Sequence, residues 1–203
     1  MTVTQIAPLD NKKRKVYIDC EYAFPLYVSD IRKYRLSEGC SIEEDLYDQL
    51  CTLVIGRISR RIAYLITDYD KSERDIRNKL LMASYPEILV DASINKLKDY
   101  GYIDDRRYAR TYADSLIARN KSIIYIRMKL NEKGISRDIT DMIIDELSYD
   151  ENEQIRQLIS KKGYDINGLN NIDYDSRRKL YSYLMRQGFS SSAIKHFFSD
   201  DNY

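Results

Sequence analysis

The 203-residue chain contains no tryptophan, one histidine and only three cysteines. Cys20, Cys40 and Cys51 form no closely spaced pair, and His196 lies far from all three in the sequence. Structural zinc sites use closely spaced cysteine and histidine ligands, so the sequence predicts no zinc site. An odd set of cysteines without a secretory signal favours reduced thiols in a cytoplasm.

The motifs that accompany many catalytic sites are also missing. The sequence contains no P-loop, G-x-G-x-x-G, C-x-x-C or H-E-x-x-H motif. The adjacent carboxylates of Asp104 and Asp105 would diverge by about 100° on a helix, and both stand where a helix start favours negative charge. We therefore expect no enzymatic activity, no catalytic residues, no metal and no cofactor.

No apolar run approaches the roughly 20 residues that cross a bilayer, and Met1 to Arg14 lacks the apolar core of a signal peptide. We therefore expect a cytoplasmic protein without membrane contact. The aromatic side chains are mainly 19 tyrosines, which suit half-exposed positions and interfaces.

Neither sign of charge is in large excess, because the chain has 33 basic and 32 acidic side chains. The distribution is uneven: residues 71–137 hold 15 basic and 9 acidic side chains, a net of 15 − 9 = +6, and residues 138–203 hold 8 and 12, a net of 8 − 12 = −4. A basic middle beside an acidic end suits a partner of mixed charge. Chance variation on a highly charged surface is the alternative.

What the chain does contain is a repeat with a period of 50 residues. The segment Ile76-Arg77-Asn78-Lys79-Leu80 aligns with Ile126-Arg127-Met128-Lys129-Leu130, and Lys71-Ser72 aligns with Lys121-Ser122. A less faithful third copy follows at an offset of 54, with an insertion at residues 163–175 that we expect to form a surface loop. A fixed period of this size is typical of small units that stack to bury a shared core.

The predicted fold is therefore all-α, with three tandem three-helix repeats in an elongated array and a small N-terminal β-hairpin or ribbon. We expect the ribbon and a short helix in residues 1–41 and the repeats in residues 42–103, 104–149 and 150–203. Such arrays present long surfaces for partners rather than a pocket for a small substrate.

The N-terminal ribbon is predicted from alternating β-branched residues. Val16 and Ile18 alternate with polar residues, which indicates a strand that turns near Cys20 to Tyr22. The basic run at residues 12–15 precedes it. This run is either an arm that contacts phosphate or a solvated, frayed terminus.

Helix boundaries follow from capping residues and apolar spacing. In the first repeat the apolar spacing predicts a long helix that starts near Ile42 and ends near Asp68 to Asp70. The apolar residues that recur at this spacing are Leu46, Leu50, Leu53, Val54, Ile58, Ile62 and Leu65. The expected boundary residues of the later helices are Ser72, Pro86, Gly101, Asp104 or Asp105, Ser122, Gly134 and Ser136. In the first helix of the second repeat we expect Tyr108, Tyr112 and Leu116 to face inward.

Arginine pairs are the candidate partner-binding residues. Arg57 and Arg60 align with Arg107 and Arg110 at the 50-residue offset, and a spacing of three places each pair on one helix face. Arginine suits bidentate contact with carboxylate or phosphate. The full set of candidate contacts to a protein or a phosphate is Arg57, Arg60, Arg61, Arg106, Arg107, Arg110, Arg127 and Lys129. The alternative is solvation with local ion pairs, for example to Asp104 or Asp114.

The segment from Leu97 to Arg110, with Gly101-Tyr102-Ile103-Asp104-Asp105 followed by Tyr108-Ala109, resembles a motif of the RecX family of bacterial recombination regulators. Lys133-Gly134-Ile135 is similar to the family's downstream turn. Tyr108 replaces the more frequent phenylalanine. The resemblance spans nearly the whole chain and implies a fold of three tandem three-helix units.

The resemblance also implies a function. Family members bind the RecA recombinase filament and dampen its strand-exchange and ATPase activities, and so act on DNA repair, recombination and the SOS response. We therefore expect a non-enzymatic, monomeric regulator of RecA, with only weak contact to single- or double-stranded DNA because the charge is near neutral. The alternative is a helix-turn-helix DNA-binding regulator that acts without RecA.

Overall fold

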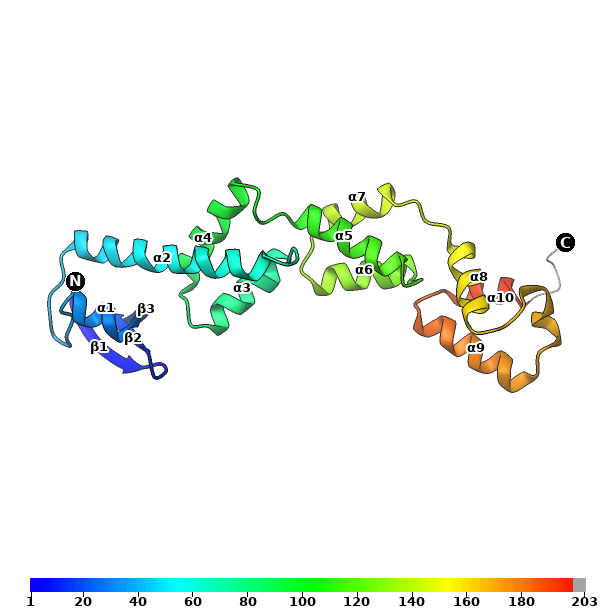
Figure 1. The fold of residues 1–203 in the computed structure, drawn as a ribbon, viewed down its shortest axis with the longest axis horizontal. Coiled ribbons are helices and arrows are strands. Elements are labelled where there is room, and N and C mark those ends of the chain that lie inside the picture. The colour runs from blue at the N-terminus through cyan, green and yellow to red at the C-terminus, as the bar shows by residue number, and fades with distance from the viewer. Residues whose placement is uncertain (199–203) are drawn as a thin grey trace. The chain divides into compact units, whose positions relative to one another are not determined.

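The computed structural model describes residues 1–198, which divide into two compact units, one from Met1 to Asp104 and one that begins at Asp105 (Figure 1). The first unit contains a small sheet and four helices, and the second contains six α-helices and a 3-10 helix. The predicted all-α repeat fold with an N-terminal β element is confirmed. The elongated arrangement stays a prediction, and residues 199–203 of the predicted third repeat lie outside the described residues.

The N-terminal sheet has three antiparallel strands in the order β1-β2-β3, with β1 at Val3–Pro8, β2 at Lys13–Ile18 and β3 at Glu21–Tyr27. The predicted turn between β2 and β3 is confirmed. Asp19 and Cys20 both adopt positive φ angles, 48° and 70°, as a two-residue type I′ hairpin requires. Pro25 is tolerated because β3 is an edge strand.

The structure corrects the interpretation of the first residues. Strand β1 was not predicted, and the basic run at residues 12–15 is neither a free arm nor a frayed terminus: it forms the end of the β1–β2 turn and the start of β2. Leu9 and Asp10 donate backbone hydrogen bonds to the Lys13 carbonyl across this turn. The run therefore has a fixed position on the folded unit.

Helices α1 (Val28–Lys33), α2 (Glu44–Ile66), α3 (Glu73–Met82) and α4 (Glu87–Asp99) complete the first unit. Of the seven apolar residues at the predicted spacing, Leu46, Leu53 and Leu65 are only half-buried. Leu50, Val54, Ile58 and Ile62 of α2 are fully buried as predicted. They share one hydrophobic core with side chains of the sheet, such as Val16, and with side chains of α3 and α4. The sheet is thus part of the core of the first repeat.

The second unit starts with α5 (Asp105–Ile117), α6 (Ile123–Glu132) and α7 (Arg137–Glu146). It continues with α8 (Glu151–Lys161), η1 (Ile166–Asn171), α9 (Tyr174–Arg186) and α10 (Ser191–His196). None of the helices within residues 1–198 combines the length and the apolar character that crossing a membrane requires.

Serine and glycine residues bound the helices where the sequence predicted them. Ser72, Ser122 and Ser136 are the N-caps of α3, α6 and α7, and each side chain accepts a hydrogen bond from a backbone amide in the first turn. Gly101 and Gly134 adopt positive φ angles of 72° and 79° just after α4 and α6, as helix C-terminal glycines commonly do.

Burial confirms the repeat in the second helix of each three-helix repeat. Ile76 and Leu80 of the first repeat and Ile126 and Leu130 of the second are all fully buried. At the offset of 54, the corresponding side chains of the third copy are also buried, and they include Leu180, Leu184, Phe189, Phe197 and Phe198.

The first helix of the second repeat differs from the prediction. Ala109 and Ala113 form its fully buried face, while Tyr108 and Tyr112 are half-buried beside it and stack at 5.7 Å between ring centroids. Only Leu116 is buried as expected. Small alanines let α5 approach its neighbours closely, and the apolar period alone did not distinguish them from the larger tyrosines.

The insertion at residues 163–175 is more than a surface loop. It contains η1, whose Leu169 is buried at 1 % exposure in the core of the third repeat. Asp165 caps η1 by accepting a hydrogen bond from the Asn167 amide. Tyr164, Ile166 and Ile172 of the same segment are partly buried against this core, so several apolar residues in a stretch of Gly, Asn and Asp anchor it.

Within the second unit, the start of α6 contacts the third repeat directly. The Ser122 amide donates to the Gln187 carbonyl at 3.2 Å, and the Ser122 hydroxyl donates to the Gly188 carbonyl at 2.7 Å. Next to Ser122, the buried Asn120 amide donates to Gln154 and Gln157 of α8. These polar contacts join the second and third repeats.

Candidate functional site

Helix α2 carries a basic and aromatic stripe beside its buried apolar stripe. The stripe starts at Arg57 and continues three, four and seven residues later with Arg60, Arg61 and Tyr64. Residues at these spacings lie on one face of a helix. Arg60, Arg61 and Tyr64 are exposed, and Tyr64 retains 72 % of its accessible surface.

The stripe forms one wall of a concave site that we call the basic pocket. It has a volume of about 690 Å³ and is lined by Lys13, Tyr27, Arg57, Arg60, Arg61, Tyr64, Ala83 and Tyr85. The other walls come from the sheet, which supplies Lys13 and Tyr27, and from the connection between α3 and α4, which supplies Ala83 and Tyr85. Four cations and three tyrosines thus surround one hollow without a lining carboxylate.

A bidentate ion pair fixes the base of the pocket. Arg57 donates from both terminal nitrogens to Asp30 of α1, at 2.7 and 2.8 Å. Partial burial raises the pKa of Asp30, but the hydrogen bonds from Arg57 and from the Tyr27 amide outweigh it, so the pKa lies below its usual value. Asp30 is therefore charged at neutral pH and offsets the charge of Arg57.

Cation–π contacts order the lining side chains. The Arg57 guanidinium lies 4.7 Å from the Tyr27 ring centroid, and the Lys13 ammonium lies 5.3 Å from the same centroid and 6.0 Å from that of Tyr85. Arg61 lies 5.5 Å from the ring centroid of its neighbour Tyr64. Each tyrosine of the pocket is thus paired with a cation that lines it.

The sheet is held in place at the pocket rim. Tyr22 of β3 donates its hydroxyl proton to the Ser84 carbonyl in the α3–α4 connection, where Ser84 adopts a positive φ of 63°. The sequence indicated Arg57, Arg60 and Arg61, and it offered the basic run at residues 12–15, which contains Lys13, as one of two alternatives for phosphate contact. It did not indicate Tyr27, Tyr64 or Tyr85. For Tyr64 the signal was present, because it continues the helical spacing of the three arginines.

The predicted arginines of α5 lie beside acidic side chains of the same repeat. Arg106 donates to Glu146 of α7 at 2.8 Å, and Arg110 lies 3.2 Å from Asp114 and 3.6 Å from the second oxygen of Glu146. Arg107 is exposed on the same helix. The alternative of local ion pairs thus holds for Asp114, and Glu146 is a partner that the sequence did not indicate.

The two arginine pairs do not occupy equivalent places in their repeats. The buried Ile58 and Ile62 of α2 correspond to the buried Ala109 and Ala113 of α5, an offset of 51 rather than 50. The helices therefore differ by one position relative to their cores, which is about 100° of rotation. The two pairs therefore align in the sequence but differ in their position relative to the buried face of their helix.

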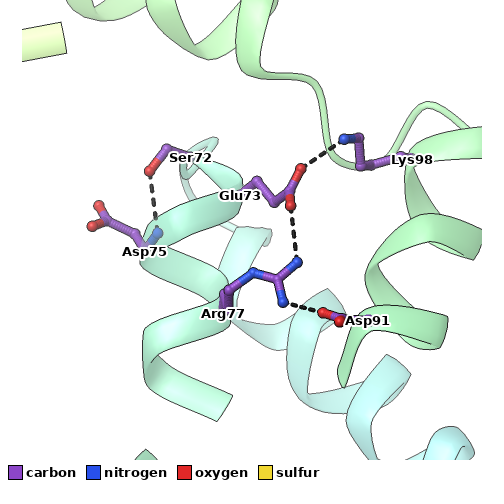
Figure 2. Close-up of polar contacts among 6 residues, drawn as sticks. All are labelled: Ser72, Glu73, Asp75, Arg77, Asp91 and Lys98. Carbon is purple, nitrogen blue, oxygen red and sulfur yellow. Dashed lines mark hydrogen bonds and ion pairs between the residues drawn. The ribbon is translucent and has the colours of Figure 1, made fainter. Parts of the chain in front are cut away.

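The recurring Arg77 and Arg127 have a role inside their repeats. Figure 2 shows Arg77 between Glu73 of its own helix and Asp91 of α4, while Glu73 also accepts from Lys98. Arg127 binds Asp141 of α7 in the same way, at the same 50-residue offset. Each arginine ties the second helix of its repeat to the third.

Lys129 also has partners within the second repeat. Its ammonium donates to Glu132 at 2.6 Å and lies 5.5 Å from the ring centroid of Tyr125. Lys129, like Arg57 and Arg127, is therefore a candidate partner-binding residue that forms an ion pair with a carboxylate of the same chain. The pairs of Arg127 and Lys129 are largely exposed and contribute little to stability, so a partner can compete for them. The Arg57–Asp30 pair is mostly buried and is not of this kind.

Comparison with known proteins gives two family matches. The model described as "RecX, second three-helix domain" matches residues 104–142, and "RecX, third three-helix domain" matches residues 149–198. A "Regulatory protein RecX" of Clostridium acetobutylicum is 31% identical over 99% of this chain and 98% of its own length. A protein of the same name from Limosilactobacillus reuteri is 28% identical over 95% of this chain and 75% of its own.

Solved structures show the same fold. One, described as "Crystal structure of regulatory protein RecX", superposes with a TM-score of 0.63 at 25% identity and covers 97% of this chain and 98% of its own. Another, RecX from Lactobacillus salivarius, gives a TM-score of 0.58 at 23% identity over 70% of this chain and 93% of its own.

Proposed function

Because the chain belongs to the RecX family of non-enzymatic regulatory proteins, we propose that it binds the RecA recombinase filament and inhibits its recombinase and ATPase activities. The observation that carries the proposal is the similarity to a RecX protein over 99% of the chain. In this role the protein modulates DNA repair and recombination, and it acts as a monomer.

We assign the contact with RecA to the exposed arginines of α5, which are Arg106, Arg107 and Arg110. The ion pairs of Arg106 and Arg110 with Asp114 and Glu146 are exposed, with side-chain exposures of 43 to 58 %. Such pairs contribute about 0–1 kcal/mol, so an acidic surface can replace them at little cost.

The filament provides a reason for a repeat protein to act here. A filament presents the same subunit surface many times, so a chain with several repeats can contact more than one subunit. The second contact then forms at a high effective concentration, and weak single contacts add up to tight binding.

Charge reversal tests this assignment. The variant Arg107→Glu/Arg110→Glu should need roughly tenfold more protein for half-inhibition of the RecA ATPase on single-stranded DNA, because attraction at two contacts becomes repulsion. Arg178→Glu/Arg186→Glu on α9 is the matched control, since both arginines are exposed and outside the proposed contact. Circular dichroism checks that both variants keep their helix content.

The outcomes separate three conclusions. Equal inhibition by both variants would remove the α5 arginines from the contact. A complete lack of inhibition by the unaltered chain would reject the RecA proposal itself. Sequence-selective, steeply salt-dependent binding to duplex DNA without RecA would favour the helix-turn-helix alternative.

A further inference from the structure

We propose that the basic pocket of the first unit binds single-stranded nucleic acid, with phosphates on Lys13, Arg60 and Arg61 and an unstacked base on Tyr64. This site goes beyond contact with RecA, and it can be tested without RecA.

The pocket has positive charge that residues 1–198 compensate only in part. Among these residues, the lining cation that holds a carboxylate within ion-pair distance is Arg57, through its bidentate contact with Asp30, while Asp10 of the β1–β2 turn interacts with Lys13 electrostatically. Arg60 donates its Nε hydrogen to the Gly56 carbonyl. This hydrogen bond does not use the two terminal nitrogens of the Arg60 guanidinium. Like charges gathered in one hollow attract anions and raise their local concentration.

The tyrosines supply flat surfaces in the same hollow. Tyr64 keeps 72 % of its surface exposed, and Arg61 lies 5.5 Å from its ring centroid. Tyr27 and Tyr85 are half-buried in the wall. Stacking of bases on aromatic side chains, next to cations that follow the backbone, is the usual way in which proteins hold single strands.

The pocket is built on rigid elements. Arg60, Arg61 and Tyr64 lie in the last two turns of the 23-residue helix α2. Lys13 is held by the pairing of β2 with its neighbours and lies opposite Tyr27 in the register of β2 with β3. The Arg57–Asp30 pair and the Tyr22–Ser84 hydrogen bond fix the sheet against the helices. The three-stranded sheet thus positions part of a preformed site.

Single strands fit this chemistry better than two other ligands. Bases in a duplex are stacked on one another and offer no face to Tyr64 except at an end. An acidic protein segment would use the cations but would gain little from the exposed ring. A single strand alternates phosphate groups with base faces, and both have partners in the pocket.

Fluorescence anisotropy with a labelled oligothymidylate of about 15 nucleotides tests the proposal on the full chain. The test variant is Arg61→Ala/Tyr64→Ala. The control is Tyr174→Ala/Arg178→Ala on α9, which removes the same two residue types from a helix of the second unit, where Tyr174 is 79 % exposed. All four side chains are on the surface, so both variants should fold.

The unaltered chain should bind with a salt slope near −2, since three phosphate contacts at about −0.7 each act together on a single strand. The test variant should lose roughly tenfold or more in affinity, while the control should retain the original affinity. Tyr64→Phe keeps the ring and should bind normally, whereas Tyr64→Ala should lose about fivefold or more.

Two further probes decide between ligands. A duplex of the same length and an oligoglutamate of the same charge should both bind more weakly than the oligothymidylate. No binding of the single strand, or an equal loss in the test and control variants, would overturn the proposal. Equal affinity for oligoglutamate with no effect of Tyr64→Ala would also overturn it and point to an acidic protein segment.

Discussion

The contact between the second and third repeats leads to a sharp prediction about Gly188. This residue has a φ of +93°, and a Cβ added to it would lie 2.5 Å from the Ser122 hydroxyl oxygen and 2.9 Å from the Tyr125 Cβ. Gly188→Ala therefore introduces both backbone strain and overlap with the start of α6. Gly163 isolates the first effect, because its φ is +82° and a Cβ there would meet nothing within 4 Å.

The two costs can be estimated separately. A side chain in the left-handed region costs about 1–2 kcal/mol, which is the whole cost expected for Gly163→Ala. Gly188→Ala adds about 1–3 kcal/mol for overlap in a packed contact, because Ser122 and Tyr125 must move. We therefore expect Gly188→Ala to destabilise the second unit by about 2–5 kcal/mol in total.

Hydrogen exchange measures this effect where it arises. In Gly188→Ala, exchange at the Ser122 amide and in the first turn of α6 should accelerate strongly, because the Ser122 amide donates to Gln187 across the contact. In Gly163→Ala, the increase should be confined to the end of α8. Urea unfolding followed by circular dichroism gives the corresponding loss of stability.

A double mutant adds an independent check. Ser122→Ala removes the oxygen that the new Cβ would overlap, so it should cost less in the Gly188→Ala background than in the unaltered chain. Equal destabilisation by the two glycine substitutions, with no change at the Ser122 amide, would show that this contact does not join the repeats as described.

Two further predictions concern ion pairs in addition to the arginine and pocket variants proposed above. Asp30→Asn should lower the stability of the first unit by about 2 kcal/mol, since Arg57 loses a charged hydrogen-bond partner. The pKa of Asp30 is lower in the folded state than its usual value of 3.8, so the stabilisation from the pair is complete above pH 3.8 and is lost as the pH falls below 3.8 toward the folded-state pKa. Thermal unfolding between pH 2.5 and 6 should therefore depend less on pH in Asp30→Asn than in the unaltered chain. Arg77→Ala should lower the melting temperature more than Arg127→Ala. Arg77 forms ion pairs with two carboxylates and its side chain is 27 % exposed, whereas the Arg127 side chain is 44 % exposed. The reverse order of melting temperatures in a calorimetric comparison would contradict the roles assigned to the two arginines.

The repeat and most helix boundaries could be predicted because their signals are local or recur along the chain. Ser72 and Ser122 cap their helices through hydrogen bonds that span three residues. Ile76 and Ile126 are buried alike because the same pattern of side chains packs in the same way in both repeats. Neither inference needs knowledge of distant parts of the chain.

The candidate site was predicted only in part, for a corresponding reason. The sequence placed Arg57, Arg60 and Arg61 on one helix, but it did not show that the sheet carries Lys13 and Tyr27 to the same hollow. Nor did it show that α5 turns Ala109 rather than Tyr108 toward its core. Both depend on which elements pack together.

The sequence by itself thus determined the periodic helices, their caps and the position of the arginines along the chain. The tertiary structure decided which of those arginines already hold a carboxylate. Arg57 meets Asp30, 27 residues earlier in the chain, and Arg127 meets Asp141. Ion pairs form only between groups within about 4 Å, and that distance is set by the packing of helices rather than by spacing in sequence.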